Sequence, residues 1–110
     1  MEFFVEAFGS GTEQALLEME AVSADLAAAM REAIIRIQFK SNHGGSLTEY
    51  IEPGLLCVRV RRNRNIARLF FAYGKNHRIW LLNGFVKKTE KIPTKHLVRA
   101  RQLLREVQAC

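Results

Sequence analysis

The chain has 110 residues, of which 48% are hydrophobic, and its formal net charge at neutral pH is +6. This length and composition predict one soluble domain, residues 1–110, with a single core that needs no metal or disulfide. No apolar run approaches the roughly 18 residues of a membrane span, and the start of the chain lacks the basic and long apolar segments of a signal peptide, which argues against a membrane protein and favours a cytoplasmic one.

The charge of the chain is divided unevenly along its length. Residues 1–53 carry three basic and nine acidic side chains, whereas residues 54–110 carry fourteen basic and two acidic ones, so the halves have net charges of −6 and +12. Such asymmetry is typical of a protein that binds a polyanion. The alternative is a solvated basic face without a ligand, and composition alone does not separate the two.

The first half of the chain predicts one strand followed by two helices. Residues 2–8 are rich in aromatic and β-branched side chains and precede a glycine-rich turn, which favours a short strand. Thr12 is placed to cap a first helix. Ser23 is placed to cap a second helix, whose apolar residues recur at helical spacing up to about Lys40. Residues 41–46 are polar and glycine-rich, and they predict a loop.

The second half predicts three strands and a last helix. After a Pro-Gly turn, residues 55–61 alternate between two faces, one of them basic. Residues 66–73 are nearly all apolar, as in a central strand, and residues 78–86 form the next strand. Pro93 favours a helix start, and the apolar face of that helix consists of Leu97, Ala100, Leu104 and Val107.

The predicted order of elements is β-α-α-β-β-β-α, which indicates an α+β fold. Strands joined in series by short turns form an antiparallel meander. We expect the helices to cover one face of this sheet and to leave the other face open, with Arg59 and Arg68 both on it.

The two cysteines, Cys57 and Cys110, are expected to be reduced thiols in a cytosolic protein. No CxxC or Cys/His spacing suggests a metal site. We therefore expect neither a metal nor another cofactor.

Three segments of the second half follow one another in a distinctive order: residues 54–61 (GLLCVRVR), 65–71 (NIARLFF) and 81–93 (LLNGFVKKTEKIP). In order and spacing they resemble the pattern GLYELR, IYRVFY and LLHGFVKKTQKTP of the HigB-like, phage-derived branch of the RelE/ParE superfamily, the toxins of type II toxin–antitoxin systems. The resemblance extends from Gly54 to about Val107, and GFVKKTEKIP is its most specific part. The first half matches only in helix order and length.

The resemblance implies a RelE-like fold, in which a curved antiparallel sheet packs on helices and its concave face binds RNA. It implies an mRNA endoribonuclease, a hydrolase that cuts mRNA in the ribosomal A site and thereby inhibits translation. It also implies a cognate helix-turn-helix antitoxin that neutralises the toxin. Such a pair represses its own operon, so the toxin would meet operator DNA only through the antitoxin.

The chain departs from the family pattern at several positions. Leu56 and Cys57 replace a Tyr-Glu pair, two tyrosines of the second segment are missing, and Asn83 stands where the pattern has His. Related toxins often carry lysines where residues 48–50 are Thr-Glu-Tyr. These departures bear on cleavage rate and codon preference rather than on the fold.

Cleaving RNA without a metal requires three things: alignment of the ribose 2′-oxygen with the phosphorus, stabilisation of charge on the phosphate, and a proton for the leaving oxygen. Arginine suits the first two tasks because its planar fork grips phosphate with two bonds. Arg59 and Arg68 are the best catalytic candidates, since each interrupts an apolar strand and a buried unpaired charge is costly. The alternative is a structural ion pair with a helix acid such as Glu18 or Glu32.

Further candidates follow from charge and from the resemblance. Lys87 and Lys88 come after the last strand and would add positive charge at the rim of the site, one of them acting on the leaving group; two solvated lysines are the alternative. Phosphate contacts are expected from arginines, and base stacking from aromatic side chains, although aromatics on strands are more often core. These RNA-binding candidates are Arg61, Arg62, Arg64, Trp80 and Phe85.

Groups that could move protons are harder to assign. Histidine is the natural base near neutral pH, and His96, on the last helix near two lysines, is a minor candidate. Glu49 and Glu52 precede the second predicted strand and could serve as a base, although acids in loops rarely do.

Two other functions remain open. A ParE-like relative would poison DNA gyrase by binding, without nuclease activity. A catalytically weak relative would only bind RNA or its antitoxin, which the missing tyrosines make plausible.

Overall fold

The computed structural model describes residues 2–109 and, within them, shows three α-helices, one 3-10 helix and five strands. The α+β class predicted from the sequence is confirmed. In chain order the elements are β1 (Phe4–Ala7), α1 (Gly11–Val22), α2 (Ala24–Arg36), η1 (Lys40–Asn42), β2 (Thr48–Glu52), β3 (Leu55–Arg62), β4 (Asn65–Tyr73), β5 (Arg78–Lys87) and α3 (Thr94–Ala109).

The strands form one five-stranded sheet in the order β1-β5-β4-β3-β2. Strands β3 to β5 form the expected antiparallel meander, which β2 extends, but β1 pairs in parallel with β5, so the sheet is mixed rather than antiparallel throughout. The predicted order also lacked β2. That strand is short, lies at the sheet edge and reaches β3 through the Pro-Gly turn, where Gly54 adopts a φ of +82°.

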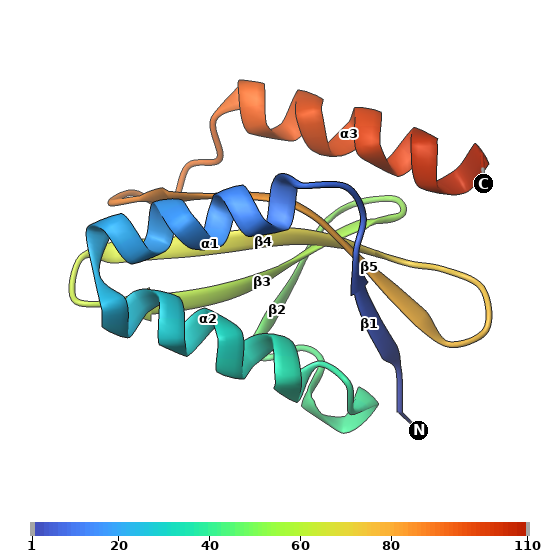
Figure 1. Ribbon diagram of the computed structural model, residues 1–110, viewed down its shortest axis with the longest axis horizontal. Coiled ribbons are helices and arrows are strands. Elements are labelled where there is room, and N and C mark those ends of the chain that lie inside the picture. The colour runs from blue at the N-terminus through green and yellow to red at the C-terminus, as the bar shows by residue number, and fades with distance from the viewer. Residues whose placement is uncertain (1, 110) are drawn as a thin grey trace.

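The helices lie on both faces of the sheet, which corrects the expectation that they cover one face. Helices α1 and α2 pack on side chains that include Val58, Leu69 and Phe71. Helix α3 packs on the opposite face, against residues that include Cys57 and Phe70. Because neighbouring strand residues point to opposite faces, the nearly continuous apolar sequence of β4 supplies both cores. In Figure 1 α3 runs along the top of the view and α2 along the bottom, with strands of the sheet between them.

Two helix starts were predicted from capping residues, with different outcomes. Ser23 caps α2 as expected, because its Oγ accepts a hydrogen bond from the backbone N–H of Leu26 at 3.3 Å. Thr12 does not cap α1, which begins at Gly11; instead its buried hydroxyl donates to the carbonyl of Leu82 in β5 at 2.9 Å. This hydrogen bond ties the first turn of α1 to the sheet.

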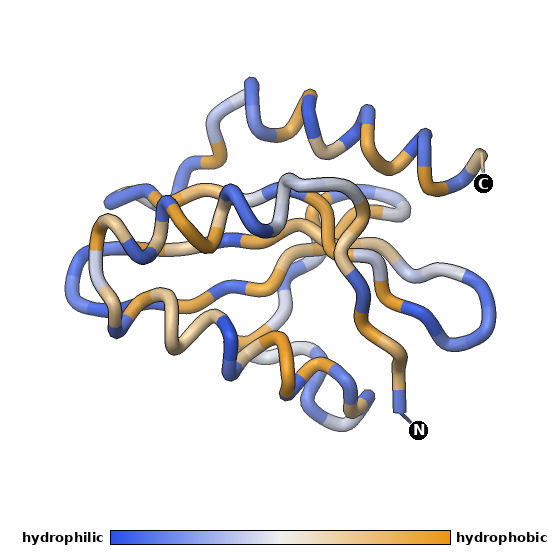
Figure 2. Tube along the Cα trace, viewed as in Figure 1, coloured by the Kyte–Doolittle hydropathy of each residue, from blue (hydrophilic) through white to orange (hydrophobic). Residues whose placement is uncertain are grey.

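The hydropathy of the chain follows this architecture. In Figure 2 the strands that cross the middle of the molecule are mostly hydrophobic, while the turns between β3 and β4 and between β4 and β5 are hydrophilic. Helix α2 ends at Arg36, before the predicted end near Lys40, and the chain continues into η1. None of the helices within residues 2–109 combines the length and the apolar composition that crossing a membrane requires.

Replacing Gly84 in β5 with alanine is expected to destabilise the fold strongly. A Cβ there would clash with the backbone carbonyl oxygen of Arg68 and approach side-chain atoms of Ala15 and Leu69 to 3.1 Å. Overpacking of this kind against backbone should lower the free energy of unfolding by about 3 kcal/mol or more. Gly45→Ala is the control, since its φ is +59° but the space around it is open, and it should cost only about 1 kcal/mol. Urea unfolding measures the free energy of unfolding of both variants. An equal decrease in the two would contradict the close packing around Gly84.

Candidate active site

The sheet face on which α3 packs also carries a row of basic side chains. In the strand register Arg59 of β3 lies opposite Arg68 of β4, and Arg68 lies opposite Phe85 of β5. Arg61 is two residues beyond Arg59 on the same strand and therefore shares its face. The prediction that Arg59 and Arg68 share a face is confirmed.

Arg68 is buried and is held by two carboxylates. Only 1% of its side chain is exposed, and its guanidinium contacts Glu49 Oε1 at 3.1 Å and Glu90 Oε1 at 3.3 Å. An arginine can be buried in this way because both partners are charged and hydrogen-bonded. The partners are neither Glu18 nor Glu32, the helix acids considered from the sequence, but residues of β2 and of the loop after β5.

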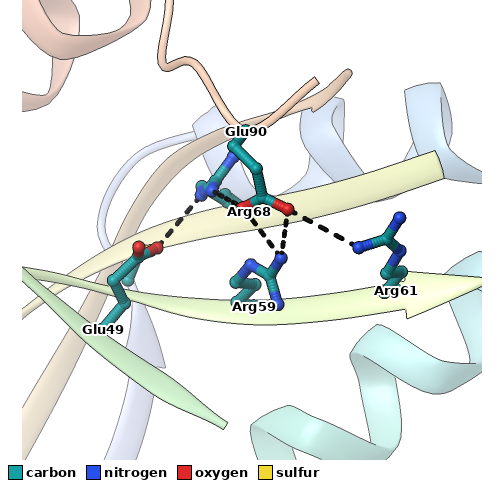
Figure 3. Close-up of polar contacts among 6 residues, drawn as sticks. Glu49, Arg59, Arg61, Arg68 and Glu90 are labelled. Carbon is teal, nitrogen blue, oxygen red and sulfur yellow. Dashed lines mark hydrogen bonds and ion pairs between the residues drawn. The ribbon is translucent and has the colours of Figure 1, made fainter. Parts of the chain in front are cut away.

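Glu90 joins three arginines into one cluster, which Figure 3 shows with its carboxylate between the guanidinium groups. Arg59 Nη2 donates to both carboxylate oxygens, at 2.7 and 2.9 Å, and Arg61 Nη1 lies 3.6 Å from Oε2. The hydrogen bonds from Arg59, assisted by the positive charges of Arg59, Arg68 and Arg61, hold the pKa of Glu90 below its usual value. We call Arg59, Arg61, Arg68 and Glu90 the arginine cluster.

Glu49 stands beside the cluster. Its carboxylate accepts a hydrogen bond from Arg68 Nε and lies 3.4 Å from Cys57 Sγ, yet about 40% of its side chain is exposed. It is therefore fixed in position while still open to a ligand. Glu49 was only a minor candidate for the base because the strand that carries it was not predicted and residues 48–52 were expected to form a loop. The Pro-Gly turn after it was the available signal, since such a turn joins two strands.

A cavity of about 300 Å³ opens at the cluster, lined by Glu49, Arg59, Glu90 and the small residues Gly45, Ser46 and Thr48. Within residues 2–109, Arg68 Nη1 is one of two buried side-chain polar atoms without a hydrogen-bond partner. Such a donor is costly to leave unsatisfied. The site thus combines clustered cations, a fixed carboxylate, an unused N–H donor and space beside them.

Lys87 and Lys88 lie at the end of β5. Lys87 stands opposite Ile66 in the register, and Ile66 stands opposite Arg61, which places Lys87 in the row next to the cluster. Both lysines also line a shallow cavity with Glu18 of α1. Both lysines thus lie beside the cluster and outside its ion pairs, and their role at the rim of the site stays a prediction.

The other candidates for RNA binding are spread more widely. Arg62 pairs with Asp25 at 3.3 Å, and Arg64 is exposed in the turn between β3 and β4. Arg62 follows Arg61 in β3 and therefore points to the opposite sheet face, toward α2, whereas Arg61 is on the face of the cluster. All three arginines are exposed. Their exposure leaves them available to phosphates.

The two aromatic candidates lie in different surroundings. Phe85 is fully buried, its ring stacked on His96 at a centroid distance of 4.5 Å and packed against Phe70 at 6.0 Å. Its ring is core in this structure and is not presented to a base. Trp80 is half-buried and lines a separate cavity of about 460 Å³, with Arg78 5.3 Å from its ring centroid.

His96 is placed against the hydrophobic core rather than in the cluster. Partial burial on Phe85, together with the charges of Lys95 and Lys87, lowers its pKa, although Glu18 acts in the opposite direction. At neutral pH it is therefore mostly uncharged, which makes it a poor proton donor to a leaving group.

Cys57 is expected to be unreactive in the folded protein. It is fully buried, and burial, together with the neighbouring carboxylate of Glu49, raises its pKa. Cys110 lies outside the described residues, so the prediction concerns a Cys110→Ser background. There, modification by a thiol reagent should be at least about a hundredfold slower than in urea, because the nucleophile is the thiolate. Equal rates in the folded and unfolded protein would contradict this burial.

The arrangement suits the handling of a phosphate group. Two arginines and a rim of lysines can neutralise a phosphate and orient it, while the Glu49 carboxylate can take a proton from a group bound in the adjacent cavity. The sheet fixes the arginines before any ligand binds, which is the preorganisation that electrostatic catalysis needs.

Comparison with known proteins places most of the chain in one family. A family model described as "Phage derived protein Gp49-like (DUF891)" matches residues 17–105. This range includes Glu49, the whole arginine cluster and both rim lysines. A search of the curated proteins gave no match.

Proposed function

Since the chain belongs to the Gp49-like phage-derived family, a RelE/HigB-like toxin family of toxin–antitoxin systems, we propose that it is a type II toxin that cleaves mRNA without a metal. We also propose that its fold is of the RelE type. The observation that carries the proposal is the convergence of Arg59, Arg61 and Arg68 on one carboxylate beside an open cavity. Three guanidinium groups that hold a carboxylate can equally hold a phosphate.

In the proposed reaction Arg59 and Arg68 bind the scissile phosphate, and Glu49 removes the proton of the ribose 2′-hydroxyl. The 2′-oxygen then attacks the phosphorus in line, and the bond to the 5′-oxygen of the next nucleotide breaks. The leaving oxygen takes a proton from Lys87 or Lys88 at the rim. The products are a 2′,3′-cyclic phosphate and a 5′-hydroxyl end, so no water or metal ion enters this step.

The rest of the basic surface is proposed to hold the RNA chain. Arg62 and Arg64 are exposed at and just after the end of β3 and would bind phosphates without regard to sequence, with a strong dependence on salt. The ribosomal A site is the proposed location of the substrate, as the resemblance implies. A cognate helix-turn-helix antitoxin would neutralise the toxin, and operator DNA would be contacted through that antitoxin.

One alternative has a specific observation in its favour. Glu90 occupies the arginines that would hold the phosphate, as expected of a relative that binds RNA or its antitoxin but cleaves weakly. Under this reading the basic face would be a docking surface alone.

A cell-free translation reaction separates the candidates. Adding the purified protein should stop translation and cut the mRNA within its translated region, while DNA gyrase in a parallel supercoiling assay keeps its activity. If gyrase were inhibited and the mRNA stayed intact, the result would favour a ParE-like gyrase inhibitor over a ribonuclease. Intact mRNA with RNA still bound would favour the binding-only relative.

A further inference from the structure

Glu90 is unusual in its surroundings. The chain has only two acidic residues between 54 and 110, against fourteen basic ones. One of the two, Glu90, is in the loop between β5 and α3. Its carboxylate is directed at the three arginines of the cluster. No packing requirement of the core explains it, because 62% of its side chain is exposed.

The contacts of Glu90 are those that a phosphate would make. Arg59 donates to both of its oxygens, and Arg68 and Arg61 approach one oxygen each, at 3.3 and 3.6 Å. Carboxylate and phosphate oxygens accept the same charge-assisted hydrogen bonds from guanidinium groups. Glu90 and a phosphate therefore cannot occupy these donors together.

The structure constrains the positions of Arg59 and Arg68 more tightly than that of Glu90. Arg59 and Arg68 project from neighbouring strands, and Arg68 keeps Glu49 as a second partner. Glu90 belongs to a loop and is tied to the site by its carboxylate. Its departure would leave the positions of the arginines unchanged and expose their donors to solvent.

We propose that Glu90 is an internal competitor that occupies the phosphate site of the arginine cluster until substrate displaces it. The proposal rests on the proposed function for the identity of the natural ligand, but the competition itself concerns any phosphate anion. The apparent affinity is lower than the intrinsic affinity by the fraction of molecules in which the site is free. Occupation of the arginines by Glu90 would weaken the binding of unrelated anions to the basic face.

The test compares Glu90→Gln with Glu52→Gln by titration calorimetry with inorganic pyrophosphate. Glutamine keeps the size of the side chain and loses its charge. Glu52 is a matched control because it also holds an arginine through two hydrogen bonds, to Arg101 at 2.8 and 3.0 Å, outside the cluster. Both variants raise the net charge by one and both release an arginine, so only competition at the cluster distinguishes them.

The expected result is that Glu90→Gln binds pyrophosphate about tenfold more tightly than the wild type, while Glu52→Gln changes the affinity less than about twofold. The proposal would be overturned if Glu90→Gln and the wild type bound pyrophosphate with equal affinity. Thermal denaturation would first establish that both proteins are folded. An equal gain in both variants would also overturn the proposal, since a general charge effect would then explain it.

A second titration separates this inference from the proposed ribonuclease. The probe is a short single-stranded RNA in which every 2′-hydroxyl is methylated, so it can bind but cannot be cut. Tighter binding of pyrophosphate by Glu90→Gln without binding of this RNA by any variant would support the competition and count against the RNA-cleaving function. RNA binding that needs Arg59 but is unchanged in Glu90→Gln would support the function and overturn the competition.

Discussion

Arg68→Ala should abolish most of the RNA cleavage, lowering its rate by about 10²- to 10³-fold, as removal of one charge-stabilising donor does in other active sites. Arg68 is expected to be the most sensitive residue because it is buried at the centre of the cluster and joins Glu49 to Glu90. Arg68→Lys should restore little activity, because an ammonium lacks the planar fork that binds two oxygens at once. The measurement is the rate at which the wild type, Arg68→Ala and Arg68→Lys each cleave a defined mRNA during translation.

Two comparisons guard this result against a simple loss of fold. Arg31→Ala removes an arginine of equal charge from an exposed pair with Glu20 on the helices, and it should leave cleavage within about twofold. Arg68→Ala should lower the free energy of unfolding by about 1–3 kcal/mol, since its carboxylate partners are partly exposed and can be hydrated. A folded Arg68→Ala protein that cleaves at the wild-type rate would remove Arg68 from the mechanism.

Glu49→Gln should lower cleavage by about 10²-fold while leaving the binding of uncleavable RNA nearly intact, as expected for the loss of a general base. Glutamine can still accept the hydrogen bond from Arg68 Nε, which the carboxylate accepts at 3.1 Å, so the guanidinium should stay in place. A single-turnover assay separates the chemical step from binding.

The matched variant for this prediction is Glu52→Gln on the same strand, whose carboxylate faces Arg101 rather than the cluster. It should cleave RNA at close to the wild-type rate. If Glu49→Gln weakens RNA binding and cleavage by the same factor, Glu49 acts by positioning Arg68 and another group accepts the proton.

The regular parts of this fold could be predicted because their signals are local. Alternating side chains in residues 55–61 predicted a strand and placed Arg59 on its basic face. Helix α2 followed from its cap and its apolar spacing. The failure at Thr12 had a non-local cause, since the hydroxyl bonds to a carbonyl 70 residues away, and no local capping rule contains that contact.

The covering of both sheet faces has a signal in the sequence of β4. Residues 66–73 are apolar at nearly every position, and in a strand this means that both faces are buried. A single layer of helices would have required polar residues at every second position of β4. The sequence therefore argued against an open second face along most of that strand, and only Arg68 marked the part of it that α3 does not fill.

The candidate site was predictable in its cations but not in its acids. Arg59 and Arg68 stood out because charge within an apolar strand needs an explanation. Glu49 and Glu90 belong to an edge strand and a loop, and they reach Arg68 across sequence separations of 19 and 22 residues. Nothing in the local pattern of either acid indicates such a partner, so the carboxylate ligands of the cluster required the structure.

The most direct test of the central claim is to induce the chain in a tightly repressed host and to map new RNA ends by their chemistry. Attack by the 2′-oxygen leaves 5′-hydroxyl ends, so we expect such ends within translated genes after induction of the wild type and their loss with Arg68→Ala. Growth arrest with intact mRNA, or new ends that carry 5′-phosphates and persist in Arg68→Ala, would contradict a metal-independent ribonuclease built on the arginine cluster.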